Sequence, residues 1–343
     1  MFKPRIIRMS EFKAAWHLLV RLCDPEFDQD SDATKMHCES TWSIEREMLR
    51  LAADHRILGL VLPKIYENEH LDRKAILASY RKQYWSEVVV STALRAETIR
   101  IQKKLKAAGI NNALLKGASF ADRLYPQPVS RVFRDIDLLV PEEDFSKAIE
   151  SVCESGYSDP QSSGVQKYQK EYGQVSLRSP SDDRFSVEIH RDLINSPSQR
   201  KRSSVAWHRL HWENHLGHGP QLTSNSMLLI AAVHATHSHR FDSLQQLCDI
   251  RQLCRGRGGR IDSHELRALA KDCRCTTALS MALAATEAMF HDAEVSELRA
   301  AVGHTWAGGL GTQLVSPKMI IRSSGWVSAV RRTILREVLK QAA

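Results

Sequence analysis

The segment that most constrains the fold is residues 135–140, DIDLLV, which alternates acidic and apolar side chains and ends at Pro141. This alternation is typical of a β-strand with one buried face. Residues two apart on a strand share a face, so we expect Asp135 and Asp137 on one side and the apolar residues packed on the other. Two carboxylates about 6–7 Å apart at Cα repel each other unless a cation neutralises them, and Mg²⁺ prefers such hard oxygen ligands. The segment therefore predicts either a metal-binding strand or simply a strand end with two solvated aspartates.

A second strand is predicted at residues 184–190, RFSVEIH. Its apolar residues belong to a buried face, while Glu188 and His190 share the opposite face. If this strand lies beside residues 135–140, Glu188 adds a third carboxylate to the acidic pair. Three converging acidic groups are what two-metal phosphoryl or nucleotidyl transfer requires. His190 then either contacts the acceptor or the leaving phosphate, or only closes the strand through a local hydrogen bond.

Upstream of both strands, a third segment has the pattern of a phosphate-binding turn. Residues 113–117, ALLKG, form a short apolar run that ends in Lys116-Gly117, and a helical stretch follows as far as Leu124. Where a strand gives way to a helix, unpaired backbone N–H groups and the helix dipole favour a phosphate, and glycine lets that phosphate approach the backbone. An ordinary strand–helix turn has the same residue types, so this segment gains weight only beside the acidic strands.

The rest of the chain is mainly helical by its pattern, and its length of 343 residues suggests about two domains. A long helix is predicted at 72–108 and a further strand at 165–177. After Pro197 the periodicity predicts only helices, at 203–215, 224–238, 241–255, 262–272, 275–290, 293–305 and 327–341. We therefore expect an α+β, mainly helical fold. Its predicted parts are an N-terminal helical region at 1–110, a small mixed-sheet core at 111–195 and a C-terminal helical domain at 196–343.

Composition excludes several classes of protein and favours an anionic partner. The 48 lysines and arginines outnumber the 40 acidic residues, and the formal charge of +8 favours nucleotides, phosphates or nucleic acid. The seven cysteines are scattered without a CxxC pair, so we expect neither a disulfide scaffold nor a zinc ribbon, and the cytoplasm is the predicted compartment. No apolar run approaches the roughly 20 residues that span a bilayer, so no membrane association is expected.

Taken together, these segments resemble the uncharacterised nucleotidyltransferase family of the polymerase-β-like nucleotidyltransferase superfamily. The resemblance rests on ALLKG at 113–117, LYP at 124–126, Arg131, DIDLLV at 135–140 and VEIH at 187–190, and it continues through residues 231–250. It implies a small mixed-sheet nucleotidyltransferase core. It also implies transfer of a nucleoside monophosphate from an NTP, such as ATP, to an acceptor hydroxyl, with Mg²⁺ or Mn²⁺ as the metal.

The resemblance further implies roles for individual residues. Asp135 and Asp137 would bind the metal ions, and Glu188 would be the third acid of this catalytic, metal-binding triad. Lys116 and Gly117 would take the place of the superfamily's Gly-Ser phosphate turn and bind the nucleotide.

Four other residues are candidate nucleotide ligands. Ser119 would substitute for the serine that the turn lacks, and Arg131 would bind phosphate oxygens in bidentate fashion. Arg134, directly before Asp135, would either clamp a phosphate or weaken metal binding through its charge. His190 would also contact the nucleotide, because it shares a strand face with Glu188.

Other functions stay open at this point. A toxin-like transferase acting on tRNA or protein would share the site, and it would bind its macromolecule through the basic stretches at 95–106 and 318–340. A catalytically inactive NTP-binding scaffold is the other alternative, and the charge of Arg134 favours it. The histidines between 208 and 239 lack the order of His and Asp that a metal phosphohydrolase needs. The acceptor is thus a small molecule, a peptide, a protein or tRNA, and the oligomeric state is not predicted.

Overall fold

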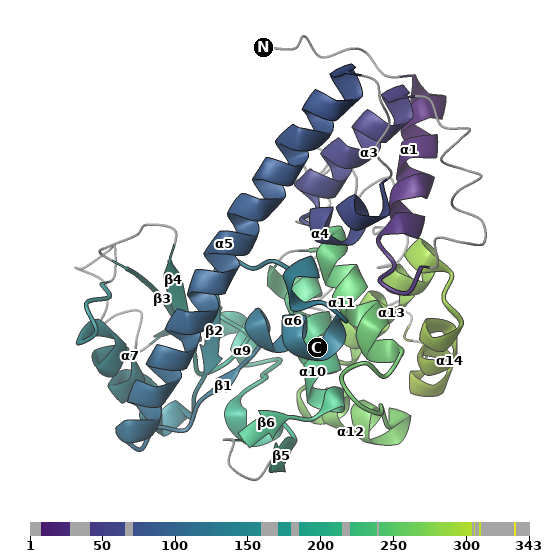
Figure 1. Ribbon diagram of the computed structural model, residues 1–343. Coiled ribbons are helices and arrows are strands. Elements are labelled where there is room, and N and C mark those ends of the chain that lie inside the picture. The colour runs from purple at the N-terminus through teal and green to yellow at the C-terminus, as the bar shows by residue number, and fades with distance from the viewer. Residues whose placement is uncertain are drawn as a thin grey trace.

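The computed structural model describes residues 8–27, 42–65, 71–158, 171–179, 185–214, 220–238, 240–303, 305, 309 and 333. Helices make up most of this part of the chain, and they surround a four-stranded mixed sheet and a two-stranded sheet (Figure 1). The predicted α+β, mainly helical fold is confirmed. Apart from residue 333, the basic stretch at 318–340 and the helix predicted at 327–341 lie outside the described residues. None of the described helices combines the length and the apolar character that crossing a membrane would need.

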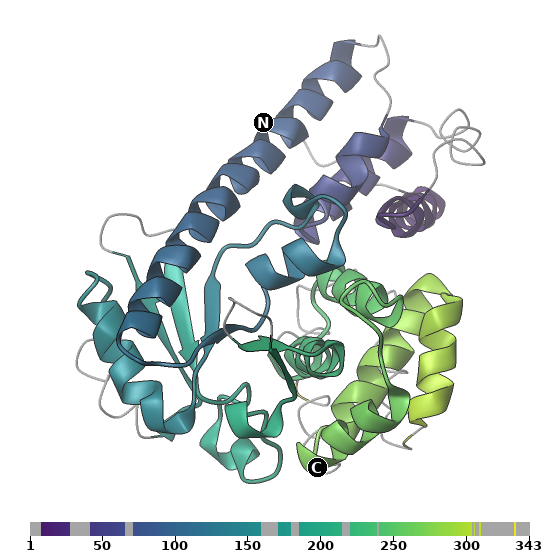
Figure 2. The same ribbon diagram turned by 60° about the horizontal axis from the view of Figure 1, so that its bottom comes forward.

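The N-terminal part of the chain is helical up to the first strand. Its elements are α1 (Met9–Leu22), α3 (Trp42–Asp54), α4 (Leu58–Val61), the 3-10 turn η2 (Leu62–Lys64) and α5 (Leu71–Ala107). α5 has 37 residues and matches the helix predicted at 72–108. It begins near α1 and α3 and ends beside the sheet, so a single helix connects the two (Figures 1 and 2).

The central sheet contains, in spatial order, β1 (Ala113–Leu114), β2 (Ile136–Leu139), β4 (Ser186–His190) and β3 (Gln174–Arg178). β2 and β4 are parallel, whereas β1 and β3 are antiparallel to their neighbours. In the pairing of β2 with β4, Asp137 lies opposite Glu188. The sequence alone leaves open whether residues 135–140 and 184–190 lie beside each other, and the structure shows that these two strands are neighbours. Of the strand predicted at 165–177, only residues 171–177 are described, and β3 begins at Gln174.

The two faces of this sheet pack against different helices. On one face, the apolar residues of β2 and β4 form a buried cluster with α5 and α7 (Phe145–Cys153). Leu139 belongs instead to a larger core that includes the C-terminal helices. Because residues alternate along a strand, Asp137 shares the face of Leu139 and is directed toward those helices.

The C-terminal helices form much of the larger core. They are α10 (Ser224–Val233), the π-helical turn η6 (His234–Ser238), α11 (Leu244–Cys254), α12 (Ser263–Asp272), α13 (Thr276–Phe290) and α14 (Ala293–Val302). The five helices predicted between 224 and 305 are confirmed, with ends that differ by a few residues. Shorter elements among the described residues are α6 (Ala118–Leu124), η3 (Pro128–Ser130), η4 (Glu142–Asp144), α9 (Pro197–Arg200) and η5 (Trp207–Arg209).

The helix predicted at 203–215 is wrong. The segment contains η5 and the strand β5 (Trp212–Asn214), which pairs antiparallel with β6 (Pro220–Leu222). Trp207 and Trp212 stack with their ring centroids 3.9 Å apart, and the Trp212 indole N–H donates to the Trp207 carbonyl oxygen. Aromatic residues pack well on extended backbone, and this stacking outweighs the helical periodicity.

Helices from both ends of the chain share the larger core. Buried residues of α1, α3 and α4 belong to the same cluster as those of α10, α11 and α13. Asp24 pairs with Arg251 and Arg255, and both arginines also pair with Asp292. The domain boundaries at 110 and 195 stay a prediction.

Candidate active site

The acidic residues of the predicted triad lie on one face of the central sheet. Asp137 stands within β2 with a fully buried side chain, and its neighbour Glu188 on β4 has a side chain that is 25% exposed. Asp135 comes one residue before β2, and its side chain is 37% exposed. The parallel pairing of two short strands thus brings together carboxylates that are about fifty residues apart in the chain.

His190 lies within the same cluster. Its Nε2 is 3.2 Å from Asp137 Oδ1 and 3.5 Å from Glu188 Oε2. Gln174 on β3 supports the other side of the cluster, because its Nε2 donates to Glu188 Oε2 at 3.4 Å. Both contacts are to Glu188 Oε2, so they restrict the position of this carboxylate.

Lys116 provides a positive charge directly beside these carboxylates. Its Nζ is 3.1 Å from Asp137 Oδ2 and 3.9 Å from Asp135 Oδ2. Lys116 was expected to face a phosphate group, and its ammonium lies against the acidic cluster. The residue comes after β1, which pairs with β2, so the sheet itself holds Lys116 next to the aspartates.

These groups shift one another's pKa values. Repulsion from Asp137, with burial, raises the pKa of Asp135. Burial alone would lower the pKa of Lys116, but the carboxylates, Asp137 first, outweigh it and raise that pKa. Burial is likewise outweighed at His190, where the hydrogen bonds to Asp137 and Glu188 raise the pKa to about 9. The cluster therefore favours positive charge, which Lys116 and a protonated His190 supply.

The donor set of this cluster fits a divalent metal ion. One ligand atom from each of Asp137, Glu188 and His190 lies within 4.8 Å of the others. Asp137 Oδ2 is buried, and the Lys116 ammonium lies 3.1 Å from it. A buried carboxylate oxygen in this state is costly unless a cation compensates it. Carboxylate oxygens are typical ligands of Mg²⁺ and Mn²⁺, and the His190 imidazole adds a nitrogen donor once it has lost its proton. Asp135 lies outside this group of three.

The Lys-Gly turn has the backbone geometry that requires a glycine. Gly117 has φ of +59° and ψ of −116° and directly precedes α6. Arg131 braces the turn, since its Nη1 donates to the Gly117 carbonyl oxygen at 3.1 Å. The same guanidinium forms a bidentate ion pair with Asp249 on α11, at 2.8 and 2.7 Å, and the Tyr125 hydroxyl also donates to Asp249 at 2.8 Å. Arg131, expected to be a phosphate ligand, is thus engaged in a buried network below the turn.

The two other predicted nucleotide ligands have different surroundings. The Arg134 side chain is 53% exposed and pairs with Glu87 on α5, with 2.6 Å between Nη2 and Oε1. Ser119 lies in the first turn of α6, where its backbone N–H donates to the Lys116 carbonyl oxygen.

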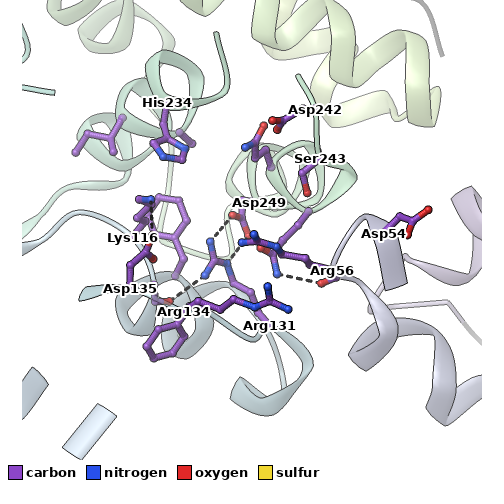
Figure 3. A pocket seen from close by; sticks show the side chains of 17 residues that line it. Asp54, Arg56, Lys116, Arg131, Arg134, Asp135, His234, Asp242, Ser243 and Asp249 are labelled. Carbon is purple, nitrogen blue, oxygen red and sulfur yellow. Dashed lines mark hydrogen bonds and ion pairs between the residues drawn. The ribbon is translucent and has the colours of Figure 1, made fainter. Parts of the chain in front are cut away.

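A cavity of about 330 Å³ opens beside Lys116 and Asp135. Figure 3 shows Lys116 and Asp135 on one side of this cavity and Asp54 on the other, with the labelled arginines between them. Its walls come from the end of α3, the glycine turn, the segment before β2, η6 and α11. The residues Arg56, His234, Gln245 and Asp249 line it but were not predicted as site residues. The only sequence signal for the last three is that residues 231–250 continue the family resemblance.

A second cavity, of about 490 Å³, lies on the side of β3. Gln174 lines it and also donates to Glu188, so this cavity lies next to the acidic cluster. The π-helical turn η6 borders both cavities: His234 lines the first and His237 the second. Widened helical turns of this kind are frequent at functional sites.

The competing sequence signals are placed away from the cluster. Among the described residues, the potential metal-binding group consists of Asp137, Glu188 and His190, and none of the histidines from 208 onward belongs to it. In the basic stretch at 95–106, Arg95 pairs with Asp122 and Arg100 with Glu97.

The comparison with protein families agrees with the resemblance. The sequence model of the family described as "Uncharacterised nucleotidyltransferase" matches residues 44–291, from α3 to the residue after α13. The match includes every residue of the acidic cluster and of the glycine turn. The chain matches no curated protein and no solved structure.

Proposed function

The chain belongs to the uncharacterised nucleotidyltransferase family, and on this premise we propose that it moves a nucleoside monophosphate from an NTP to a hydroxyl of an acceptor, with Mg²⁺ or Mn²⁺. Family membership itself supports nucleotidyl transfer in general terms. The observation that carries the finer proposal is the register of β2 and β4, which sets Asp137 opposite Glu188 beside the Lys116-Gly117 turn. We keep the cytoplasm as the proposed compartment, on the cysteine usage of the sequence.

In this proposal Asp135, Asp137 and Glu188 hold the metal, and His190 orients two of these carboxylates. Bound metal would neutralise charge on the transferred phosphoryl group and lower the pKa of the acceptor hydroxyl. The chain's own contribution is positioning and electrostatics, which dominate catalysis of phosphoryl transfer. No covalent enzyme intermediate is needed.

Lys116 and Gly117 receive the phosphates in this proposal. With metal bound at the acidic cluster, the Lys116 ammonium would no longer be needed to balance the charge of Asp137 and would be able to pair with a phosphate oxygen. Gly117 lets phosphate approach the backbone closely, and Arg131 keeps the turn in place through the Gly117 carbonyl. The geometry of Arg131 favours a supporting role over direct phosphate contact. Arg134 and Ser119 stay candidates for direct contact.

The two cavities suggest where the substrates bind. The cavity lined by Lys116 and three arginines suits the anionic NTP, and the one on the β3 side, next to Glu188, suits the acceptor. The acceptor class, whether small molecule, peptide, protein or tRNA, is not defined by these walls. Pairing of Arg134 with Glu87 argues against the inactive scaffold, since that charge is compensated away from Asp135.

The test is transfer of label from each α-³²P NTP, with Mg²⁺ or Mn²⁺ and cell extract as the source of acceptor. Label should appear on an acceptor with wild-type protein and be lost with Asp137→Asn and with addition of a chelator. Asp272→Asn, at an exposed position on α12, is the matched control. Label on RNA or protein would identify the toxin-like transferase. Nucleotide binding without any transfer would identify the inactive scaffold and refute the proposal.

A further inference from the structure

Arg56 occupies a backbone position that is normally reserved for glycine. It follows the end of α3, and its φ is +58°. The Arg56 N–H donates to the Ala53 carbonyl, and the Ile57 N–H donates to the Ala52 carbonyl. This pair of hydrogen bonds is the Schellman pattern, which requires the left-handed conformation at the residue after the C-cap. A side chain is mildly strained there, and glycine is the residue most often found at this position.

The backbone of Arg56 is held against α11. Gln245 Nε2 donates to the Arg56 carbonyl oxygen at 3.1 Å. The preceding residue, His55, accepts a hydrogen bond at Nδ1 from the Leu244 N–H, and its carbonyl accepts one from the Ser243 hydroxyl. The start of the Arg56 side chain is therefore fixed relative to the cavity that Gln245 and Ser243 also line.

The side chain of Arg56 lines the cavity beside Asp135. Among the lysine and arginine side chains that line this cavity, it is the one without an ion pair to a described residue. Lys116 pairs with Asp137, Arg131 with Asp249 and Arg134 with Glu87. By contrast, the Arg56 guanidinium makes no hydrogen bond or ion pair with any residue that the structure describes.

Its charge does reach the acidic cluster, because it lowers the pKa of Asp135 against the stronger effects of Asp137 and burial. With Asp135 engaged by a bound metal, as the proposed function requires, this guanidinium would still be available for an anion.

The same chain contains a matched position that lacks the cavity. Arg274 follows α12 with φ of +53°, and its N–H donates to the Lys271 carbonyl while the Cys275 N–H donates to the Ala270 carbonyl. The two arginines thus occupy the same backbone motif, and the side chain of each is exposed. Arg274 lines neither of the two cavities described above.

We propose that Arg56 is a binding residue for the triphosphate of the nucleotide, supplied to the site by the N-terminal helices. This rests on the proposed function and adds to it a contact from outside the sheet core. A guanidinium presents two parallel N–H donors that match phosphate oxygens, and a fixed backbone reduces the entropy lost on binding. Triphosphate is the anion that fits, because the cavity wall also contains Lys116, Gly117 and Asp135.

The experiment is calorimetric titration of the full-length protein with inorganic triphosphate, with ATP and with adenosine, in the presence of Mg²⁺. Arg56→Gly should weaken triphosphate and ATP binding roughly 10- to 100-fold, the loss expected for a charge-assisted hydrogen bond. Arg56→Lys should lose part of the affinity, because it keeps the charge without the bidentate geometry. Adenosine binding should be unchanged, and Arg274→Gly should bind every ligand like the wild type.

The thermal midpoint of unfolding separates binding from folding. Glycine fits the left-handed position, so both Arg56→Gly and Arg274→Gly should unfold at or above the wild-type temperature. Triphosphate binding that is unchanged in Arg56→Gly would overturn the inference, even if label transfer is intact. A loss of triphosphate binding in Arg56→Gly supports it, even if the transfer assay fails, and that failure would then concern only the proposed function.

Discussion

Replacing Asp249 by alanine tests the buried ion pair that supports the glycine turn. Asp249 accepts hydrogen bonds from Arg131 Nε at 2.8 Å, Arg131 Nη2 at 2.7 Å and the Tyr125 hydroxyl at 2.8 Å. Each charged side chain is 6% exposed. Burial alone would lower the pKa of Arg131, but the pairing with Asp249 raises it, so the guanidinium is charged in the native protein. Asp249→Ala leaves this charge buried without its partner, and we expect the free energy of unfolding to fall by about 3–5 kcal/mol.

The assay is chemical denaturation followed by circular dichroism on a set of matched variants. Asp249→Asn keeps an acceptor for Tyr125 but removes the charge, so its loss should be smaller, about 1.5–3 kcal/mol. Arg131→Met combined with Asp249→Ala removes both charges. Apolar replacement of a buried pair is often close to neutral, so the double variant should be more stable than Asp249→Ala alone. Asp272→Ala, which breaks a surface pair, should change the stability by about 1 kcal/mol or less.

Two results would refute this reasoning. One is a loss of less than about 1 kcal/mol in Asp249→Ala, which would mean that water or relaxation compensates the arginine. The other is a double variant whose loss equals the sum of the single losses, since groups in direct contact should couple. Because Arg131 also donates to the Gly117 carbonyl, the folded fraction of Asp249→Ala should bind triphosphate more weakly than wild type.

The remaining predictions concern a ligand's support, the turn and pH. Gln174→Ala removes the hydrogen bond to Glu188 Oε2 and should raise the dissociation constant of Mn²⁺, measured by titration, about 10- to 100-fold. An unchanged Mn²⁺ affinity would count against the proposed metal site. Gly117→Ala should lower the free energy of unfolding by about 1–2 kcal/mol. The loss comes from backbone strain alone, because the added Cβ would lie 3.5 Å from its nearest neighbour, on Phe133, and so would not clash. An unchanged free energy of unfolding would exclude the positive φ. Burial lowers the pKa of His55 to about 4, so stability should be complete above pH 6.5, where the unfolded chain also has a neutral histidine. It should fall by about 3 kcal/mol in total as the pH drops from 6.5 to 4, and His55→Asn should remove this part of the slope in pH-dependent denaturation.

The sequence was most informative where the pattern had a period of two. The alternation in DIDLLV predicted both the strand and the face of each aspartate, because a one-residue slip would bury the carboxylates among α5 and α7. The neighbouring position of Glu188 followed only if two strands about fifty residues apart paired, and nothing local encodes that pairing. The adjacency depends on the sheet order β1-β2-β4-β3, which is a property of the whole fold.

The cavity walls were not predictable in the same way. Arg131 and Asp249 are 118 residues apart, and their ion pair leaves no periodic trace in either segment. The sequence therefore favours a phosphate-binding role for Arg131, because its partner Asp249 on α11 is evident only from the fold. Arg56 was missed for another reason: the left-handed position after α3 is normally marked by glycine, and here the marker is absent. The helix predicted at 203–215 failed because stacking of Trp207 on Trp212 is a contact that periodicity does not register.

Lys116 supplies a cation that the buried acidic cluster needs. Asp137 has a fully buried carboxylate next to two other acidic side chains, and without compensation the charged form would be costly. The Lys116 ammonium, 3.1 Å from Asp137 Oδ2, supplies that charge from the segment that follows β1. In the proposed function the same ammonium faces the phosphates once a metal ion takes over the compensation. If metal binds to Asp137 as we propose, the ammonium would compete with it for one carboxylate, and a triphosphate that gives Lys116 a new partner would offset this cost. Metal and nucleotide would therefore bind cooperatively, each favouring the lysine position that the other requires.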